Sequence, residues 1–335
     1  MITGDPASNP ADVSPATRPA GGPPALGPPP ADVEAAAALM GASMAASTVH
    51  AYARDWRAWA AYADAHGLDP LPADPAHVCA FLAAYATGRK ATTTQRAAMA
   101  IGKAHRLAGL ASPVDHEHVR RTLAGLRRTK GMALRQALPL CTDDVARLVA
   151  AAPGGLRGVR DRAFVLAGFV GAFRVGELVA LDAEDLDPRT EGIVARVRRA
   201  KTDQEGRGRL KPLPLAPERV DLCPVRALRS WRDAAGIETG PLWRGITKGG
   251  SLRSGRLTTR AALDLVKVLA ERAGMHPERI SPHSLRAGHV TEAKRRDAPD
   301  LAVMSQTHHA RAESLLGYVR ESDPFRHTSA KFLGL

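Results

Sequence analysis

The segment from Ser281 to Arg286 places an imidazole and a guanidinium where a helix would begin. Ser281 is a typical N-cap and Pro282 a typical first helical residue, so His283 and Arg286 would share the face of the first turn. A helix N-terminus attracts phosphate through its free N–H groups and its dipole. The segment therefore indicates a phosphate site, although a histidine at this position can equally cap the helix or pack.

Arg174 and Glu177 form a second cluster, directly after the apolar run that ends at Phe173. Residues three apart lie on one helix face and can pair. A guanidinium held near the interior needs an anionic partner. The cluster fits a structural ion pair, and it also fits an arginine that binds phosphate.

Lys201 lies in the polar segment KTDQEGRG, between two stretches that we expect to be strands. A lysine at the tip of a hairpin can reach into a neighbouring site. Taken alone, an exposed turn lysine needs no function.

Tyr318 follows His309 by nine residues, on an amphipathic segment with Leu315 and Leu316. Taken alone, it is better explained as a core tyrosine. The adjacent His308 and His309 could suggest a metal. Because no carboxylate or cysteine stands at ligand spacing beside them, we expect no metal site.

The order of these elements is more specific than any one of them. Arginine, lysine, a His-x-x-Arg box, histidine and, nine residues later, tyrosine follow one another as in the tyrosine recombinases, the phage integrase family, which the chain resembles. FRVGEL resembles the first-arginine motif, KTDQEGRG the hairpin-lysine segment and HSLR the His-x-x-Arg box. The similarity covers roughly residues 138–335. The chain departs from the family in two places: His308 stands where glycine is usual, and Ala287, Gly288 and His289 replace the usual residues after the box arginine.

The resemblance implies an enzyme that cleaves and rejoins DNA through a 3′-phosphotyrosine. Tyr318 would attack the scissile phosphate, and Arg174 and Arg286 would clamp its non-bridging oxygens. A 5′-hydroxyl from another strand would then attack the phosphotyrosine. Each step exchanges one phosphodiester for another, so no cofactor is expected.

The resemblance also implies roles for four further residues. His283 would help to remove the phenol proton, since free tyrosine has a pKa near ~10. Lys201 would protonate the leaving 5′-oxygen, His309 would hydrogen-bond the phosphate, and Glu177 would orient its neighbours. The implied partner is double-stranded DNA, bound as a homotetramer on two DNA sites. Residues 323–335 could dock on a neighbouring subunit.

The elements that must position these residues are mostly helices. Apolar periodicity predicts helices within 43–130, capped by Ser47 and by Asp74, with a buried stripe of Val49, Tyr52, Trp56, Trp59 and Ala63 in the first. Thr142 is expected to cap another helix, and further helices are expected near 224–235, 260–273, 282–294 and 310–319. Residues 192–199 suit a strand, and 210–215 an edge strand because Pro212 and Pro214 exclude a central one. The expected fold class is mainly α with one small β-hairpin (α+β). The resemblance implies a tyrosine-recombinase catalytic domain preceded by a helical, SAM-like core-binding domain.

Composition shifts divide the chain into four parts. Residues 1–36 are rich in Pro and Ala and are expected to be a disordered arm. We expect a helical core-binding domain over 43–130, a linker over 131–137 and the catalytic domain over 138–335.

The chain carries 47 Lys and Arg against 34 Asp and Glu, a net charge of +13, which favours a nucleic-acid partner. Biased genome composition is the alternative source of this charge. The helix near 115–129 holds a basic cluster that could grip phosphates or could be a solvated face. Its members are Arg120, Arg121, Arg127, Arg128 and Lys130.

Three rival functions stay open at this point. A type IB topoisomerase or a telomere resolvase would use the same chemistry, a non-catalytic DNA-binding protein would keep only the basic surface, and a plain helical scaffold would not bind DNA. The three cysteines are far apart and predict no disulfide framework. No segment has the length of a membrane span or the pattern of a signal peptide, so a cytoplasmic protein is expected.

Overall fold

The structure is a computed structural model, and it describes residues 44, 46–131, 138–198 and 208–309. The chain divides into two compact units, Met1–Ala133 and Leu134–Leu335, which are described separately. Among the described residues, no helix combines the length and apolarity needed to cross a bilayer. The predicted arm 1–36, the predicted linker except Gly131, and the predicted helix 310–319 all lie outside the described residues.

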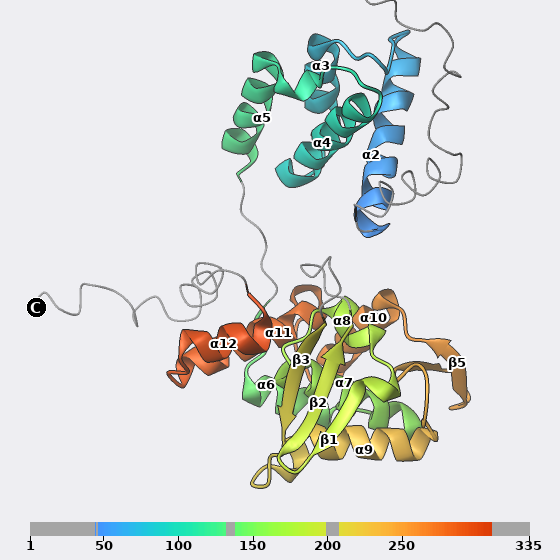
Figure 1. Cartoon of the computed structure of the whole chain (residues 1–335), viewed down its shortest axis with the longest axis vertical. Coiled ribbons are helices and arrows are strands. Elements are labelled where there is room, and N and C mark those ends of the chain that lie inside the picture. The colour runs from blue at the N-terminus through green and yellow to red at the C-terminus, as the bar shows by residue number, and fades with distance from the viewer. Residues whose placement is uncertain (1–43, 45, 132–137, 199–207, 310–335) are drawn as a thin grey trace, which may run out of the picture. The chain divides into compact units, whose positions relative to one another are not determined.

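The N-terminal unit consists of helices (Figure 1). They pack around aromatic side chains. Trp59 and Phe81 are buried and meet edge to face, with ring centroids 5.3 Å apart. The predicted stripe is confirmed for Trp59 and Ala63, but Val49 is 43% exposed because the first turn of the first helix lies beyond the core. The helices are α2 (Ala46–Ala65), α3 (Pro75–Tyr85), α4 (Ala91–Leu107) and α5 (Glu117–Lys130), with a short 3-10 turn η1 (Pro113–Asp115).

The N-cap predicted at Asp74 is confirmed, whereas those predicted at Ser47 and Thr142 are wrong. Asp74 caps α3 as expected: its Oδ1 accepts from the Ala76 N–H at 2.6 Å, and Pro75 is the first helical residue. Ser47 lies inside α2 and is not its cap. Thr142 is the first residue of its helix, and Cys141 before it occupies the N-cap. In both cases the helix begins earlier than predicted: α2 begins at Ala46, and the later helix begins at Thr142 itself.

The C-terminal unit is also mainly helical, and it holds two small antiparallel sheets, so the prediction of a single hairpin was too simple. Its buried centre includes Phe164, Trp231 and Trp243. The α-helices are α6 (Thr142–Ala150), α7 (Gly155–Val170), α8 (Val175–Ala180), α9 (Pro224–Ala235), α10 (Thr259–Arg272), α11 (Pro282–Arg295) and α12 (Asp300–Thr307). The short 3-10 turns are η2 (Ala183–Asp185), η3 (Val220–Leu222) and η4 (Pro277–Arg279).

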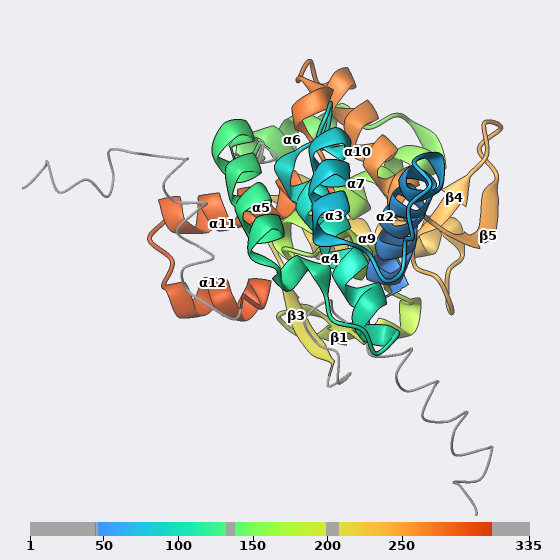
Figure 2. The same ribbon diagram turned by 90° about the horizontal axis from the view of Figure 1, so that it is seen from above.

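The larger sheet has the order β1 (Leu186–Arg189), β2 (Gly192–Val197), β3 (Arg209–Pro214). β3 is an edge strand, as Pro212 and Pro214 predicted, since neither proline can donate to a further strand. The second sheet pairs β4 (Arg244–Ile246) with β5 (Leu252–Arg256). In both views this second hairpin and α12 lie at opposite sides of the unit (Figures 1 and 2).

Gly288 allows α11 to pack against the backbone of Leu140. The Leu140 N–H donates to the Ser284 carbonyl at 3.1 Å, and a Cβ added at Gly288 would lie 1.7 Å from the Leu140 carbonyl oxygen. This close approach explains the glycine that follows the His-x-x-Arg box by two residues.

Gly288→Ala is expected to lower the free energy of unfolding by at least about 1–3 kcal/mol, because backbone rather than a flexible side chain must move. Urea unfolding followed by circular dichroism measures the change. Gly255→Ala, where an added Cβ would meet nothing within 4 Å, is the matched control. Equal stability of the two variants would contradict this packing argument.

Candidate active site

Arg174 lies in the turn between α7 and α8, where it is the N-cap residue of α8. Glu177 in the first turn of α8 binds it twice: its Oε2 accepts from the Arg174 N–H at 3.0 Å, and its Oε1 accepts from Arg174 Nη1 at 2.7 Å. The predicted pair is confirmed, although Arg174 precedes the helix instead of lying on its face. The Glu177 side chain is 4% exposed and that of Arg174 is 26% exposed, so part of the arginine still faces solvent.

Glu177 is held as a carboxylate. Burial alone would raise its pKa, but the hydrogen bonds from Arg174 and the charges of Arg174 and Lys211 outweigh burial and lower the pKa. A buried anion in this state can fix the direction of the Arg174 guanidinium. Ala172, two residues before Arg174, has φ +46°, a strained backbone conformation of the kind that accumulates at functional sites.

Arg286 is 1% exposed and joins three segments that are far apart in the sequence. From α11, its Nη1 donates to the Ala172 carbonyl at 2.6 Å and its Nη2 donates to the Thr307 carbonyl at 2.6 Å. The same Nη2 lies 3.1 Å from Nε2 of His309. The predicted box arginine therefore contacts both the loop that carries Arg174 and the segment that carries His309.

Thr307 fixes the His309 ring. Its Oγ1 donates to the Val303 carbonyl at 2.7 Å and lies 2.9 Å from Nδ1 of His309. This pattern assigns the proton of His309 to Nδ1, which donates to Thr307, and leaves Nε2 to accept from Arg286. Partial burial and then the charge of Arg286 lower the pKa of His309 to about 4, so the ring is neutral at pH 7.

His283 lies in the first turn of α11, as predicted, with Ser281 as the N-cap and Pro282 as the first helical residue. Partial desolvation of its ring, followed by repulsion from Arg286 and Arg174, lowers its pKa. Both arginines thus lie within electrostatic reach of His283. A neutral imidazole at pH 7 is the form that can accept a proton.

His308 occupies the position where the family usually has glycine. Its φ of +55° makes it the left-handed C-cap of α12, a conformation that glycine adopts without strain. The His308 N–H donates to the Met304 carbonyl at 2.7 Å, and its own carbonyl accepts from Arg209 Nη1 at 3.3 Å. The departure from the family pattern therefore preserves the helix end.

Two of the predicted site residues, Lys201 and Tyr318, lie outside the described residues. The structure brings together Arg174, Glu177, His283, Arg286 and His309. It also adds Thr307 and Lys211, which the sequence reasoning missed. The signal for Thr307 was its spacing two residues before His309, and that for Lys211 was its place two residues before the inward-facing Leu213.

The basic cluster of α5 is only partly free for a ligand. Arg121 and Arg128 are exposed, whereas Arg127 is half-buried. Nε of Arg120 lies 3.4 Å from Oε2 of Glu117. The Lys130 ammonium donates to the carbonyls of Ala86 and Arg89 within the N-terminal unit. Lys130 therefore holds the end of α5 to the loop after α3.

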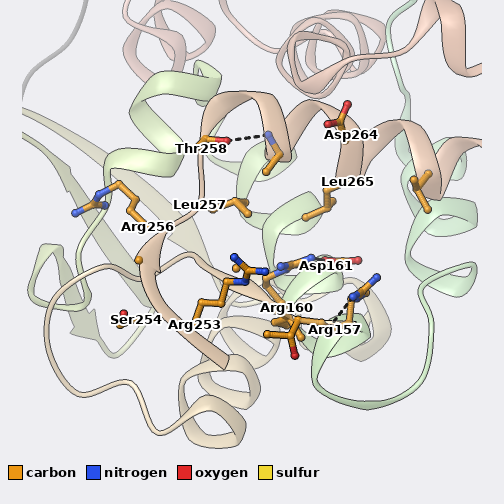
Figure 3. A pocket seen from close by; sticks show the side chains of 16 residues that line it. Arg157, Arg160, Asp161, Arg253, Ser254, Arg256, Leu257, Thr258, Asp264 and Leu265 are labelled. Atoms are coloured by element: carbon orange, nitrogen blue, oxygen red, sulfur yellow. Dashed lines mark hydrogen bonds and ion pairs between the residues drawn. The ribbon is translucent and has the colours of Figure 1, made fainter. Parts of the chain in front are cut away.

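A hollow of about 930 Å³ lies between α7, the β4–β5 hairpin and α10 (Figure 3). Arg157, Arg160 and Arg256 are among its lining residues. Each binds an internal acceptor: Arg157 donates to the Thr247 carbonyl, Arg160 pairs with Asp161, and Arg256 pairs with Asp182. None of the predicted catalytic residues that the structure describes lines this hollow, which is therefore separate from the cluster around Arg286.

Comparison with known proteins decides the family. Residues 140–324 match the phage integrase family, and residues 38–108 match the phage integrase N-terminal SAM-like domain. The chain belongs to the phage integrase family. It is a tyrosine recombinase, and the predicted fold class is confirmed. An integrase/recombinase XerD homologue of Selenomonas ruminantium is 34% identical over 288 residues, covering 85% of this chain and 84% of the relative.

More distant matches are also named as tyrosine recombinases or integrases. The tyrosine recombinase XerD of Mycobacterium tuberculosis is 27% identical over 267 residues, covering 74% of this chain and 78% of the relative. A lambda integrase(75–356) dimer bound to a COC′ core site has a TM-score of 0.59 at 17% identity, with 88% of this chain and 95% of that chain covered. The Tn1549 transposon integrase in complex with transposon right end DNA has a TM-score of 0.60 at 14% identity, with coverages of 86% and 93%. At these identities the two structures establish the shared fold.

Proposed function

We propose that this recombinase cleaves and rejoins double-stranded DNA at a specific site through a 3′-phosphotyrosyl intermediate at Tyr318. The observation that carries the proposal is the hydrogen bonding of Arg286 to the Ala172 carbonyl and to His309, which gathers three distant motifs around one point. The phenol of Tyr318 forms the new P–O bond, and the 5′-oxygen leaves. A 5′-hydroxyl of a second strand then reverses the step on a new partner.

The site would act mainly through the positive charge of its arginines. The transition state of phosphoryl transfer concentrates negative charge on the non-bridging oxygens, and aimed guanidiniums stabilise it most. Arg174 is partly exposed and is oriented by Glu177, so it can turn towards a phosphate. The negative charge of a bound phosphate would raise the pKa of His309, which would then donate from Nε2 instead of accepting from Arg286.

Two groups would move the protons. His283 accepts the phenol proton of Tyr318, consistent with its lowered pKa and its place beside both arginines. Lys201 protonates the leaving 5′-oxygen by the family resemblance. Each of the two phosphoryl transfers replaces one phosphodiester bond with another, so the reaction needs no cofactor.

The exposed arginines of α5 are proposed to bind the DNA backbone. The slope of log affinity against log salt concentration is negative, and replacing both Arg121 and Arg128 by Ala should make it shallower by about 2, because each phosphate contact contributes about −0.9. Fluorescence anisotropy with a random-sequence duplex of about 30 base pairs measures the slope. The double variant Arg226→Ala, Arg229→Ala makes the same charge change on exposed positions of α9 and should have a smaller effect. Equal slopes for the two variants would contradict specific phosphate contacts by Arg121 and Arg128 and would indicate that only the net charge matters.

The proposal includes a homotetramer on two DNA duplexes, with residues 323–335 of each subunit docked on a neighbour. These residues lie outside the described ones. A chain that ends at Ser322 should still bind DNA but should lose tetramer assembly and strand exchange. Native gel analysis of the DNA complexes, together with a recombination assay, tests this. Normal assembly and recombination by the shortened chain would refute the docking proposal.

The function itself is tested by trapping the covalent intermediate. Randomly nicked genomic DNA from the organism that encodes the chain serves as substrate, because a nick next to the cleavage point lets the short fragment diffuse away and prevents rejoining. Precipitation of the detergent-denatured protein should then carry DNA with it. Sequencing of that DNA defines the site, from which a nicked suicide duplex can be made.

Two outcomes would contradict the proposal. If no detergent-resistant protein–DNA complex formed, the chain would be a DNA-binding protein that does not form the phosphotyrosyl bond. Site-independent relaxation of supercoiled plasmid, with no exchange between two copies of the site, would indicate the topoisomerase reaction instead.

A further inference from the structure

Lys211 is an interior lysine of the catalytic unit, with 0% of its surface exposed. It lies on β3, where inward positions alternate with outward ones, so Lys211 faces the core together with Leu213. Its cross-strand partner on β2 is Ala195, also 0% exposed, whose small side chain leaves room for the long one. A lysine almost never lies fully buried unless it is paired, so this position calls for a specific reason.

The Lys211 ammonium has a backbone acceptor for each of its three N–H groups. Nζ donates to the Gly171 carbonyl at 2.8 Å, the Ala172 carbonyl at 3.3 Å and the Gln306 carbonyl at 2.6 Å. The aromatic ring of Phe173 lies 5.1 Å from Nζ and adds a cation–π contact. The amine can donate to all three carbonyls at once only when it carries its full set of three protons.

These three carbonyls belong to the two segments that carry catalytic side chains. Gly171 and Ala172 directly precede Phe173 and Arg174, and Gln306 lies three residues before His309. Arg286 bridges the same two segments one step further along, through the carbonyls of Ala172 and Thr307. Lys211 therefore forms a second link between the arginine loop and the end of α12, and its buried ammonium is out of reach of a substrate.

Burial and the neighbouring charges bring the pKa of Lys211 close to neutral pH. Burial and the guanidiniums of Arg286, Arg174 and Arg209 lower its pKa to about 7, whereas Glu177 on α8 opposes this. His289 on α11, and His308 and His309 after α12, also face its charge. Loss of the proton leaves two N–H groups for three carbonyls, so the link is weakened as the pH rises through this range.

We propose that Lys211 is a positioning residue that sets the spacing between Arg174 and His309 by binding the backbone of both segments, and that only its ammonium form completes this link. The inference rests on the proposed function for its effect on cleavage. The link itself is a property of the free protein.

Single-turnover cleavage of the nicked suicide duplex measures the effect. Lys211→Met should cleave about 10- to 100-fold more slowly, because misplacement of catalytic groups by about 1 Å costs this much, while DNA affinity stays within about 3-fold. Lys211→Arg keeps a charge that does not titrate near pH 7 and should recover much of the rate. The ratio of the wild-type rate to the Lys211→Arg rate should fall as the pH rises through about 7.

Lys248→Met, at an exposed turn between β4 and β5, is the matched control and should cleave at the wild-type rate. A wild-type rate for Lys211→Met would overturn the proposal. A pH-independent ratio, with no rescue by Lys211→Arg, would also overturn it and would indicate a purely structural lysine.

A second measurement separates this inference from the proposed function. In the free protein, the ring resonances of ¹³C-labelled His309 should shift in Lys211→Met and stay unchanged in Lys248→Met. Unchanged His309 resonances in Lys211→Met would overturn the inference even if the wild-type chain cleaves DNA. Failure of the wild-type chain to form an adduct would instead overturn the proposed function, and the resonance shifts would still decide the role of Lys211.

Discussion

Tyr318→Phe is expected to eliminate the covalent protein–DNA complex while DNA binding persists. The change removes one oxygen atom, and that atom is the proposed nucleophile. Loss of the nucleophile costs about 10⁶-fold in a serine protease, and a loss of that size would place the remaining rate below detection. Denaturing electrophoresis of the reaction with the suicide duplex measures the complex, and anisotropy measures the binding.

Tyr52→Phe makes the same atomic change in the N-terminal unit and should leave the covalent complex intact. The chain has four tyrosines, and the other three, Tyr52, Tyr62 and Tyr85, all lie in that unit. If the covalent complex survived Tyr318→Phe, the nucleophile would be a different residue, and the mechanism would have to be rebuilt around it.

Arg174→Ala is expected to reduce the cleavage rate about 10²- to 10³-fold, the cost of losing one aimed donor to a developing negative charge. Arg174 is 26% exposed, whereas Arg286 is buried. Removal of the Arg286 side chain would leave the Thr307 carbonyl without its buried donor, at about 1–3 kcal/mol, and would leave the Ala172 carbonyl with the longer bond from Lys211. Single-turnover cleavage and anisotropy separate the effect on rate from the effect on binding.

Arg260→Ala provides the control, because this arginine is 79% exposed and pairs only with Asp264 on its own helix among the described interactions. It should change neither rate nor affinity by more than about 3-fold, as expected of an exposed pair worth less than ~1 kcal/mol. Parallel loss of binding and cleavage in Arg174→Ala would contradict a role specific to the transition state and would assign the arginine to ground-state binding.

The sequence predicted the long elements well because their signals are local. α9 spans Pro224–Ala235, the predicted range, and α11 begins at the predicted Pro282. In both, a proline at the first position and an apolar stripe act within one or two turns. The strands β1, β4 and β5 were not predicted, since pieces of three to five residues depend on partners elsewhere in the chain.

The sequence was enough to predict which residues belong to the site, but not which long-range contacts they make. The spacing of Arg174 and Glu177 is enough to predict their pair, because both lie within one turn. The bond between Arg286 and the Ala172 carbonyl joins residues 114 positions apart and requires the fold. Lys211 was missed for the same reason: a lysine in a strand is usually outward, and only the tertiary arrangement supplies its three acceptors.

The most direct test of the mechanism is to identify the residue that carries the DNA. The covalent complex is digested with nuclease and trypsin, and mass spectrometry locates the peptide with the added nucleotide. The account predicts a 3′-phosphonucleotide on the phenol oxygen of Tyr318. The same modification on Tyr52, Tyr62 or Tyr85, or on a serine or histidine of the catalytic unit, would contradict it.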